Sequence, residues 1–565
     1  MDQSKPSFFI TTPIYYVNAD PHLGTAYSTI IADVQARYRR SAGYNVKFLT
    51  GMDEHGEKVA EAAAKHNMTP QEWTDSQAPH FKELWSKLEI SNDDFIRTTE
   101  PRQHHAVQYL WERMKESGYL YKGSYDGWYC VPDETYFTDT QVQKGDEEYG
   151  SVGQHLCPDC HRPLERVQEE SYFFKLSAFQ DKLLKLYDEH PDFVEPAFRM
   201  NEVRSFVEGG LNDLSVSRTS FDWGIQVPFD EGHVTYVWFD ALLNYMTAVG
   251  YGVDTDEARA ELAYRWPAQF HIVGKDIIRF HCVIWPAMLM AIGEALPEHV
   301  FAHGFLTVRN AETGKAEKMS KSRGNAIAPQ DVIDMLGVEG YRYYFMTDVV
   351  PGTDGAISFD RMEQVYNADL ANSWGNLISR SLNMSGKYFD GCAPAKPASF
   401  DAFDNPLAKI ADGLVERYMA KMDVLDYGGA KDEVMELIHA ANHYIEDSEP
   451  WALAKDEAKA DELAFVIYNL LEAIRIAAHL LMPLMPQTSA EALRRLSCED
   501  EARPTTSRAF ALGACLPAVS LSRRASRCSR VWAKTRRAIS AICCLDVRAW
   551  PPRSMPFRFK TPPSC

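Results

Sequence analysis

Strand-like runs alternate with helix-like runs at the start of the chain, and this order constrains the fold more than any other feature. Phe8–Thr12 is an apolar run, and helical spacing of apolar residues follows it at Tyr27, Ile30, Ile31, Val34 and Tyr38. Asn45–Gly56 reads as a second strand that ends in a polar loop, and Lys58–His66 as a helix. Strands and helices in this order predict a parallel sheet with right-handed crossovers.

The pattern is interrupted and then resumes. After about residue 117 the chain becomes rich in Gly, Tyr and Asp. Segments with strand and helix patterns return at His233–Met246, Phe270–Leu289 and His299–Val308. We therefore expect an α/β fold: a Rossmann-like, doubly wound parallel sheet over residues 1–117 and 233–325, split by a connective insertion at 118–232. Residues 326–367 are expected to link this domain to the C-terminal part of the chain.

Helical spacing alone is found from Ala368 to Leu496. Three segments, 368–384, 430–454 and 462–485, place apolar residues at i, i+3, i+4 and i+7. This predicts an all-α helical bundle over residues 368–502.

The last segment, 503–565, differs from the rest in composition. It holds thirteen Lys or Arg against one acidic residue, Asp546, together with five of the eleven cysteines and two Pro-Pro pairs. One interpretation is a basic tail that binds RNA. We instead expect the product of a reading-frame shift near the 3′ end of the gene, disordered and without function.

Bulk composition limits the class of protein. A net charge of -20 over 565 residues argues against coating nucleic acid through overall charge, although a local basic groove remains compatible with it. The longest apolar stretch, Ala473–Met485, is interrupted by charged residues and proline and is shorter than a membrane span. The cysteine spacing is not that of a secreted disulfide framework. We expect a cytoplasmic protein with no membrane partner.

Two polar motifs indicate nucleotide chemistry. Pro21-His22-Leu23-Gly24-Thr25 lies between the first strand and its helix, where backbone N–H groups, a close-approach glycine and an imidazole can bind phosphate. Lys318, Ser320, Lys321 and Ser322 lie in a loop after the last strand, where lysines and hydroxyls can follow developing charge on a polyphosphate.

His22–Thr25 and Lys318-Met319-Ser320-Lys321-Ser322 together resemble the two signature motifs of class I aminoacyl-tRNA synthetases. Within that class, residues 6–500 resemble the methionyl-tRNA synthetase family, most closely in these stretches: TTPIYYVN, FLTGMDEHG, RTSFDWGIQVP, YVWFDALLNY, VGKDIIRFH, FAHGFL and EKMSKSRGN. The resemblance implies adenylation of L-methionine with ATP and Mg²⁺, then transfer to tRNA(Met), including initiator tRNA. Thr25 departs from the family pattern, which more often has a second histidine there.

The resemblance also implies site residues. It implies that the phosphates are stabilised during catalysis by His22, Lys318 and Lys321. It implies ATP binding by His22, Gly24, Thr25, Lys275, Asp276, His303, Gly304, Lys318, Ser320 and Lys321. It implies methionine binding by Ile14, Tyr16, Asp53, Trp238, Ala241, Tyr245, Ile277 and His281. An apolar slot with aromatic walls suits a thioether, and a carboxylate suits its ammonium group. Leu242 is left out because some relatives have proline there.

The insertion contains a candidate metal site. Cys157 and Cys160 have knuckle spacing, and Cys130 with Asp133 forms the partner pair. Zinc accepts thiolate and carboxylate ligands, so a structural Cys₃Asp site is chemically possible. His161 is an alternative fourth ligand, and a knuckle that has lost its metal is the other interpretation.

In the predicted bundle, the resemblance implies that Asn376, Arg380 and Trp451 read the anticodon. Single-stranded bases are recognised by stacking on aromatic rings and by hydrogen bonds to their edges, which suits these residue types. No appended dimerisation module follows, so a monomer is expected.

Three other functions fit the sequence less well. Synthetases for valine, isoleucine and leucine carry a far longer editing insertion, and the cysteine enzyme has zinc in its active site. A small-molecule nucleotidylyltransferase shares the histidine turn but does not need the helical bundle. A non-enzymatic RNA-binding protein would be expected to lose His22, Lys318 or Lys321, and all three are present.

Overall fold

The computed structural model describes residues 4–17, 20–131, 135–137, 139, 141–145, 153–158, 160–309, 316–318, 327–394 and 403–498. The chain divides into two compact units. Unit 1 comprises residues 1–362, 420–429 and 482–486, and unit 2 comprises the rest. The expected tail, 503–565, lies outside the described residues.

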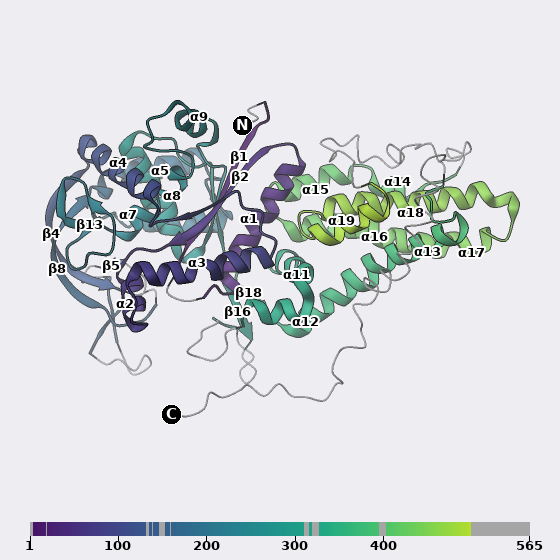
Figure 1. Cartoon of the computed structure of the whole chain (residues 1–565), viewed down its shortest axis with the longest axis horizontal. Helices are drawn as coiled ribbons and strands as arrows, with labels where there is room; N and C mark the ends of the chain where they lie inside the picture. The colour runs from purple at the N-terminus through teal and green to yellow at the C-terminus, as the bar shows by residue number, and fades with distance from the viewer. Residues whose placement is uncertain are drawn as a thin grey trace, which may run out of the picture. The chain divides into compact units, whose positions relative to one another are not determined.

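Unit 1 is built on a six-stranded parallel sheet in the order β3-β2-β1-β14-β15-β9 (Figure 1). Its strands are β1 (Ser7–Tyr16), β2 (Asn45–Asp53), β3 (Asp94–Arg97), β9 (Val194–Glu195), β14 (Phe270–Gly274) and β15 (His299–His303). The chain runs outward from β1 to β3 and resumes on the other side of β1 at β14. The predicted doubly wound sheet with an insertion is therefore confirmed, and its switch point lies between β1 and β14.

Helices complete the sheet-containing core. They are α1 (Leu23–Ser41), α2 (Glu57–Lys65), α3 (Pro70–Lys87), α4 (Pro101–Ser117), α7 (Val237–Ala241), α8 (Asn244–Thr247), α9 (Asp256–Arg265) and α10 (Trp285–Ile292). Phe9 and Ile10 of β1 and Ile30 and Ile31 of α1 are fully buried. Helix α1 packs along β1 and β2 (Figure 1), so burial of these apolar side chains fixes the turn that contains His22.

The insertion is a mainly antiparallel region. A long ribbon pairs β4 (Leu120–Cys130) with β8 (Glu165–Phe174) and curves along the outer edge of unit 1 (Figure 1). The other elements are β5 (Thr135–Phe137), β6 (Gln143–Lys144), β7 (His155–Leu156), α5 (Gln180–Glu189), α6 (Ala197–Glu208), β10 (Leu214–Ser215), β11 (Ser217–Arg218), β12 (Gln226–Val227) and β13 (Asp230–Thr235). Strand β9 comes from residues 118–232 yet pairs with β15, so this segment adds an edge strand to the main sheet.

A small sheet and a buried ion pair follow β15. Strands β16 (Leu306–Arg309), β17 (Ala316–Lys318) and β18 (Gly355–Ile357) form the sheet, with α11 (Pro329–Thr347) and α12 (Phe359–Val365) nearby in the chain. Arg342 of α11 and Asp33 of α1 are fully buried and 2.7 Å apart. Although burial alone raises it, Arg342 and Arg37 hold the pKa of Asp33 below its usual value. Removing Asp33 would take away the carboxylate that pairs with the buried guanidinium of Arg342.

In the described residues of unit 2 the secondary structure is entirely helical, as predicted. Its helices are a π-helical segment, η5 (Tyr366–Gly375), then α13 (Asn376–Tyr388), α14 (Pro406–Ala411), α15 (Leu414–Met422), α16 (Tyr427–Ser448), α17 (Pro450–Leu453), α18 (Ala460–Leu481) and α19 (Pro486–Arg495). Helices α15, α16 and α19 extend beyond the limits of the unit.

One helical stretch, Glu457–Leu481, is long and apolar enough to cross a membrane by length and composition alone. Its most apolar window is 89% buried inside the protein. A helix that is apolar on all sides is expected at the centre of a bundle. The stretch is therefore accounted for as the core helix of unit 2.

Candidate active site

Four of the residues expected to bind ATP and methionine lie at the carboxyl ends of neighbouring parallel strands. His22 follows β1, Asp53 ends β2, Lys275 follows β14 and His303 ends β15. Because these strands are parallel, their carboxyl ends share one edge of the sheet, next to the switch point. The edge combines a helix N-terminus with both acidic and basic side chains.

His22 is the N-cap of α1 and forms a capping box with Thr25. The Thr25 backbone N–H donates to Nδ1 of His22 over 3.3 Å, and the His22 N–H donates to the Thr25 hydroxyl over 3.3 Å. Since Nδ1 accepts, the proton of the neutral ring is on Nε2, the donor that a phosphate oxygen needs. Thr25 is buried whereas His22 is exposed, so the structure gives Thr25 a local capping contact.

Gly24 lies directly under the His22 ring. A Cβ added to Gly24 would lie 3.1 Å from Cε1 and 3.2 Å from Nδ1 of His22. Any side chain there would displace the imidazole, which explains why glycine suits this position.

His303 is joined to the same turn. Its Nε2 lies 2.6 Å from the Ser28 hydroxyl of α1, and its Nδ1 lies 2.8 Å from the Gly304 carbonyl. Burial lowers the pKa of His303, so the ring is neutral near pH 7. A Cβ on Gly304 would lie 2.1 Å from the Thr353 carbonyl oxygen, so close backbone packing accounts for this glycine.

Lys275 is engaged by a carboxylate. Its Nζ lies 2.7 Å from Asp354, and it also lies 4.5 Å from the centre of the Phe305 ring. Burial raises the pKa of Asp354, but hydrogen bonds from Lys275 and from the Phe305 N–H outweigh it and hold this pKa low. Asp276 is exposed beside Lys275.

Five of the predicted methionine-binding residues belong to one apolar cluster or pack against it. Ile14, Tyr16, Trp238 and Ile277 are half-buried against the main core, which contains the buried Tyr245. The Trp238 and Phe280 rings are stacked with centroids 3.8 Å apart.

The polar groups beside this cluster are buried. The Tyr245 hydroxyl lies 2.7 Å from Nε2 of His281, whose Nδ1 lies 3.0 Å from the Ile277 carbonyl. Burial lowers the pKa of His281 to about 4. Asp53 is 2% exposed, and Ala241 is buried too. A set of apolar side chains with a buried carboxylate can bind an amino acid that has an apolar side chain.

The predicted lysine loop is described only in part. Lys318 belongs to β17, which pairs with β16 at Thr307, but its side chain is not among those described. Ser320 and Lys321 lie outside the described residues.

The three cysteines of the predicted knuckle come together in the insertion. Their sulfur atoms lie within 4.8 Å of one another, and the sulfurs of Cys130 and Cys160 are 3.6 Å apart. Cys157 is buried beside them. Asp133, the predicted fourth ligand, lies outside the described residues; Nδ1 of His161 is 3.0 Å from the Gln143 side chain.

In unit 2, Asn376 and Arg380 lie one turn apart on α13 and contact α16. Asn376 donates to Asn442 over 3.2 Å, and Arg380 pairs with Glu446 over 2.6 Å. Trp451 is on α17, five residues after Glu446, and is 39% exposed. An exposed indole and an arginine have the chemistry to stack on and hydrogen-bond to unpaired bases.

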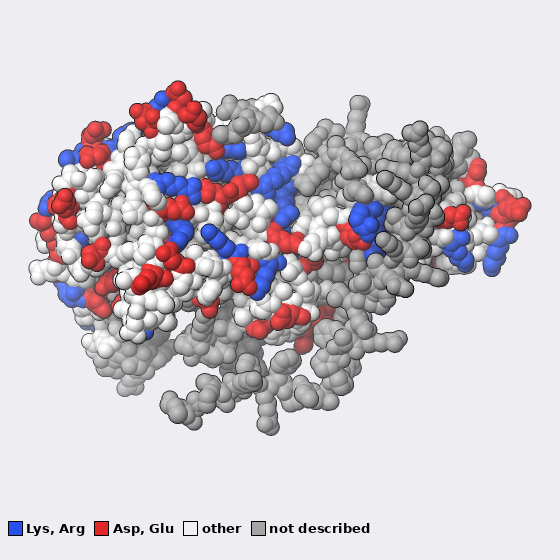
Figure 2. Space-filling model, in the orientation of Figure 1, with Lys and Arg blue, Asp and Glu red and all other residues white. Residues whose placement is uncertain are grey.

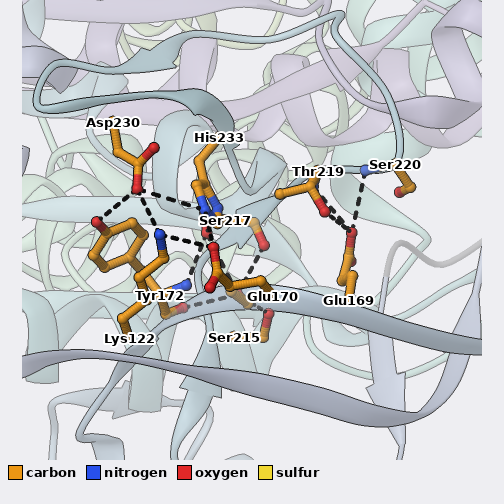
Figure 3. Close-up of polar contacts among 11 residues, drawn as sticks. Lys122, Glu169, Glu170, Tyr172, Ser215, Ser217, Thr219, Ser220, Asp230 and His233 are labelled. Carbon is orange, nitrogen blue, oxygen red and sulfur yellow. Dashed lines mark hydrogen bonds and ion pairs between the residues drawn. The ribbon is translucent and has the colours of Figure 1, made fainter.

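A polar network in the insertion resembles a hydrolytic triad. Nδ1 of His233 lies 3.0 Å from the Ser217 hydroxyl and its Nε2 lies 3.4 Å from Glu170, while Lys122 bridges Glu170 and Asp230 (Figure 3). Ser217 is fully buried and accepts the Tyr172 N–H over 2.9 Å. A nucleophile needs access to substrate, so this network serves to connect the ribbon of β4 and β8 with β11 and β13.

Comparison with known proteins gives the class. Residues 8–382 match the family model described as tRNA synthetases class I (M), and residues 397–521 match that of the anticodon binding domain of methionyl tRNA ligase. The second match continues past residue 502, the predicted end of the helical domain. Fold, strand-end residues and these matches define a class I aminoacyl-tRNA synthetase.

Similar proteins identify the family within the class. The chain is 48% identical to methionine–tRNA ligase of Thermotoga maritima over 87% of this chain and 76% of that protein. It is 43% identical to that of Bacillus subtilis over 89% and 74%. A structure of Mycobacterium tuberculosis methionyl-tRNA synthetase in complex with methionyl-adenylate matches with a TM-score of 0.80 and 43% identity, covering 86% of this chain and 93% of that one. The chain belongs to the methionyl-tRNA synthetase family, whose members are ATP-dependent methionine–tRNA ligases.

Proposed function

We propose that the chain activates L-methionine with ATP to methionyl-adenylate and pyrophosphate, then transfers methionine to the 3′ end of tRNA(Met), including initiator tRNA. The observation that carries the proposal is the group of His22, Asp53 and His303 at one sheet edge, in a chain 43% identical to an enzyme solved with methionyl-adenylate. The class I fold and the anticodon-domain match support the same reaction.

Adenylation needs charge stabilisation more than proton transfer. The methionine carboxylate is ionised near pH 7, so it attacks the α-phosphorus without a protein base. His22 donates from Nε2 to a phosphate oxygen, and Lys318 and Lys321 neutralise the departing pyrophosphate. Mg²⁺, when bound, would supply further charge neutralisation on the phosphates.

The remaining nucleotide contacts lie around the same edge. Gly24 and the first turn of α1 approach the phosphates, with Thr25 holding that turn and Ser320 adding a hydroxyl. Lys275, Asp276, His303 and Gly304 bind the adenosine side. Lys275 keeps its Asp354 contact, which fixes the direction of its ammonium group.

Methionine binds with its ammonium group on Asp53 and its thioether against the apolar cluster. We assign the slot for the side chain to Ile14, Tyr16, Trp238, Ala241, Tyr245, Ile277 and His281. His281 is neutral at working pH, so the slot adds no charge beside the thioether, which suits a polarizable apolar chain.

Transfer requires tRNA to reach both units. We assign adenylation to residues 1–117 and 233–325, contact with the tRNA stem to 326–367, and anticodon reading to 368–502 through Asn376, Arg380 and Trp451. Residues 118–232 are the connective insertion with the cysteine cluster. On the face in Figure 2, Lys and Arg lie among Asp and Glu, so a net charge of -20 leaves basic groups at the surface. The enzyme acts as a monomer in the cytoplasm.

The cysteine cluster holds a structural zinc ion. Tetrahedral Zn–S bonds of about 2.3 Å place sulfur atoms about 3.8 Å apart, close to the 3.6 Å between Cys130 and Cys160. Cys130, Cys157 and Cys160 are three ligands, and Asp133 or His161 is the fourth. Metal analysis of the purified protein should find about one zinc per chain, and Cys160→Ser should lower this content. Equal zinc content in both proteins would contradict the assignment.

Methionine-dependent ATP–pyrophosphate exchange tests the lysines. Lys321→Ala should lower the exchange rate about 100-fold with methionine affinity nearly unchanged, because the ammonium acts on the transition state. Lys65→Ala is the matched control, since this lysine of α2 is 72% exposed. Equal rates for wild type and Lys321→Ala would contradict the role.

A further inference from the structure

The loop that follows Asp53 is held in place at successive residues. The Glu54 side chain is fully buried and accepts from Nε of Arg97 over 2.6 Å. Nε1 of Trp223 donates to the Glu54 carbonyl over 2.6 Å. Gly56 has a φ of 100°, a conformation that glycine adopts most readily. The loop is therefore a fixed support for the carboxylate of Asp53.

The next residue of this loop contacts a distant helix. Nδ1 of His55 lies 2.6 Å from Oδ2 of Asp240, and the two side chains are 3% and 1% exposed. Asp240 is on α7, and the two residues are 185 positions apart in the sequence. A carboxylate this buried requires donors, and the contact implies that Nδ1 of His55 is protonated.

A side chain from a third element, α4, also contacts Asp240. Nε2 of Gln103, on α4, donates to Oδ1 and to the backbone carbonyl of Asp240, each over 2.8 Å. Gln103 is fully buried. Each carboxylate oxygen of Asp240 thus has a donor, and α4, α7 and the end of β2 are connected through one side chain.

His55 and Asp240 flank the proposed methionine site. His55 comes two positions after Asp53, and Asp240 lies between Trp238 and Ala241 on α7. We propose that the His55–Asp240 pair is a positioning device that fixes the distance between the ammonium-binding carboxylate and the side-chain slot. The proposal rests on the proposed function, and His55 acts through Asp53 without contacting methionine.

If the pair fixes this distance, it affects ligands that contact both Asp53 and the side-chain slot. Methionine must satisfy Asp53 and the apolar slot at once, so loosening their spacing weakens its binding. An analogue without the α-amino group uses the slot alone, so its binding does not depend on that spacing. Comparing the two ligands separates positioning from general damage to the site.

The experiment is methionine-dependent ATP–pyrophosphate exchange with variants of the full chain. His55→Leu should raise the KM for methionine about tenfold or more, because a buried carboxylate loses a donor, and leave the KM for ATP within about twofold. His55→Asn should stay within about threefold of wild type, since its amide N–H can replace Nδ1–H. The inhibition constant of 4-(methylthio)butanoate, the analogue without the amino group, should change by less than about twofold in His55→Leu.

A matched control separates the contact from the loss of a buried ring. His104 lies beside His55, with ring centroids 5.5 Å apart, on the same helix as Gln103. His104→Leu removes an imidazole without touching Asp240 and should leave the methionine KM within about twofold. If His55→Leu fails to fold, Gln103→Met removes the other donor and should raise the methionine KM about threefold.

Three results would overturn the proposal: an unchanged methionine KM in His55→Leu, an equal loss in His104→Leu, or an equal weakening of methionine and of the analogue without the amino group. Wild-type protein without methionine-dependent exchange would instead overturn the proposed function. The two failures are therefore distinguishable in one set of assays.

Discussion

At the scale of single residues, His22 and Thr25 share one capping box but present different groups to a ligand. The His22 ring is exposed and its Nδ1 accepts the Thr25 N–H, whereas the hydroxyl of the buried Thr25 accepts the His22 N–H. We therefore expect Thr25 to stabilise the turn and His22 to contact the phosphate.

This division predicts unequal costs of substitution. His22→Ala should lower the methionine-dependent exchange rate about 100-fold, because a transition-state donor is lost. Thr25→Ala should cost less than about tenfold, because it removes a cap contact of about 1 kcal/mol, and Thr25→Ser should restore most of the loss. Exchange rates of the three variants check this, and a larger loss in Thr25→Ala than in His22→Ala would contradict the roles.

His281 makes stability depend on pH. Burial lowers its pKa to about 4 in the folded protein, against about 6.5 in an unfolded chain. Between these values the unfolded chain binds a proton that the folded protein does not, so stability falls as pH falls from 6.5 to 4. Thermal melts of wild type and His281→Gln at pH 7 and pH 5 should show the smaller pH effect in His281→Gln. An equal pH effect in both proteins would be the contrary outcome.

At the scale of elements, β2 and β3 approach too closely for a side chain at Gly51. A Cβ there would lie 2.1 Å from the carbonyl oxygen of Ile96, its registered partner. That oxygen belongs to the sheet backbone and cannot turn aside as a side chain could.

Gly51→Ala should therefore destabilise unit 1 by about 3 kcal/mol, visible as a lower Tm and loss of exchange activity. Gly232→Ala is the control, because it is also a strand glycine and its Cβ would meet only Asp230 Oδ1 at 3.7 Å. A Tm equal in the two variants would show that β3 can shift without cost.

The sequence predicts long elements of this fold well and short ones poorly. The apolar runs that begin near Phe8, Phe270 and His299 correspond to central strands of the sheet. Such runs are predictable because a parallel strand buried on both faces has a nearly continuous apolar sequence. Strand β9 has two residues and no alternation, so no pattern could assign it to the main sheet.

Some features of the site can likewise be predicted from the sequence and others cannot. The strand-end position of His22 and Asp53 follows from local sequence, whereas the contact of His55 with Asp240 joins residues 185 positions apart. The capping contact between Thr25 and His22 cannot be predicted from the sequence either, because histidine is not a usual N-cap residue.

At the scale of the whole molecule, two units divide the proposed reaction. The strand-end residues belong to unit 1, and Asn376, Arg380 and Trp451 belong to unit 2. Adenylation without tRNA should need the first group only.

Trp451→Ala should therefore leave methionine-dependent exchange within about twofold of wild type and lower charging of tRNA(Met) about tenfold or more, since base stacking is lost. Trp451 is partly exposed, so its removal should leave the fold intact. Initial rates of both reactions check this, with Phe359→Ala as an exposed aromatic control in unit 1. Equal charging by the Trp451 variant and wild type would remove it from the anticodon contact.

Every role assigned to unit 1 depends on methionine activation, and the amino-acid specificity of activation can be measured. Purified protein is assayed for ATP–pyrophosphate exchange with each of the standard amino acids in turn. We expect exchange that is stimulated by methionine and lowered about 100-fold in His22→Ala. Exchange stimulated by another amino acid, with none for methionine, would contradict this expectation.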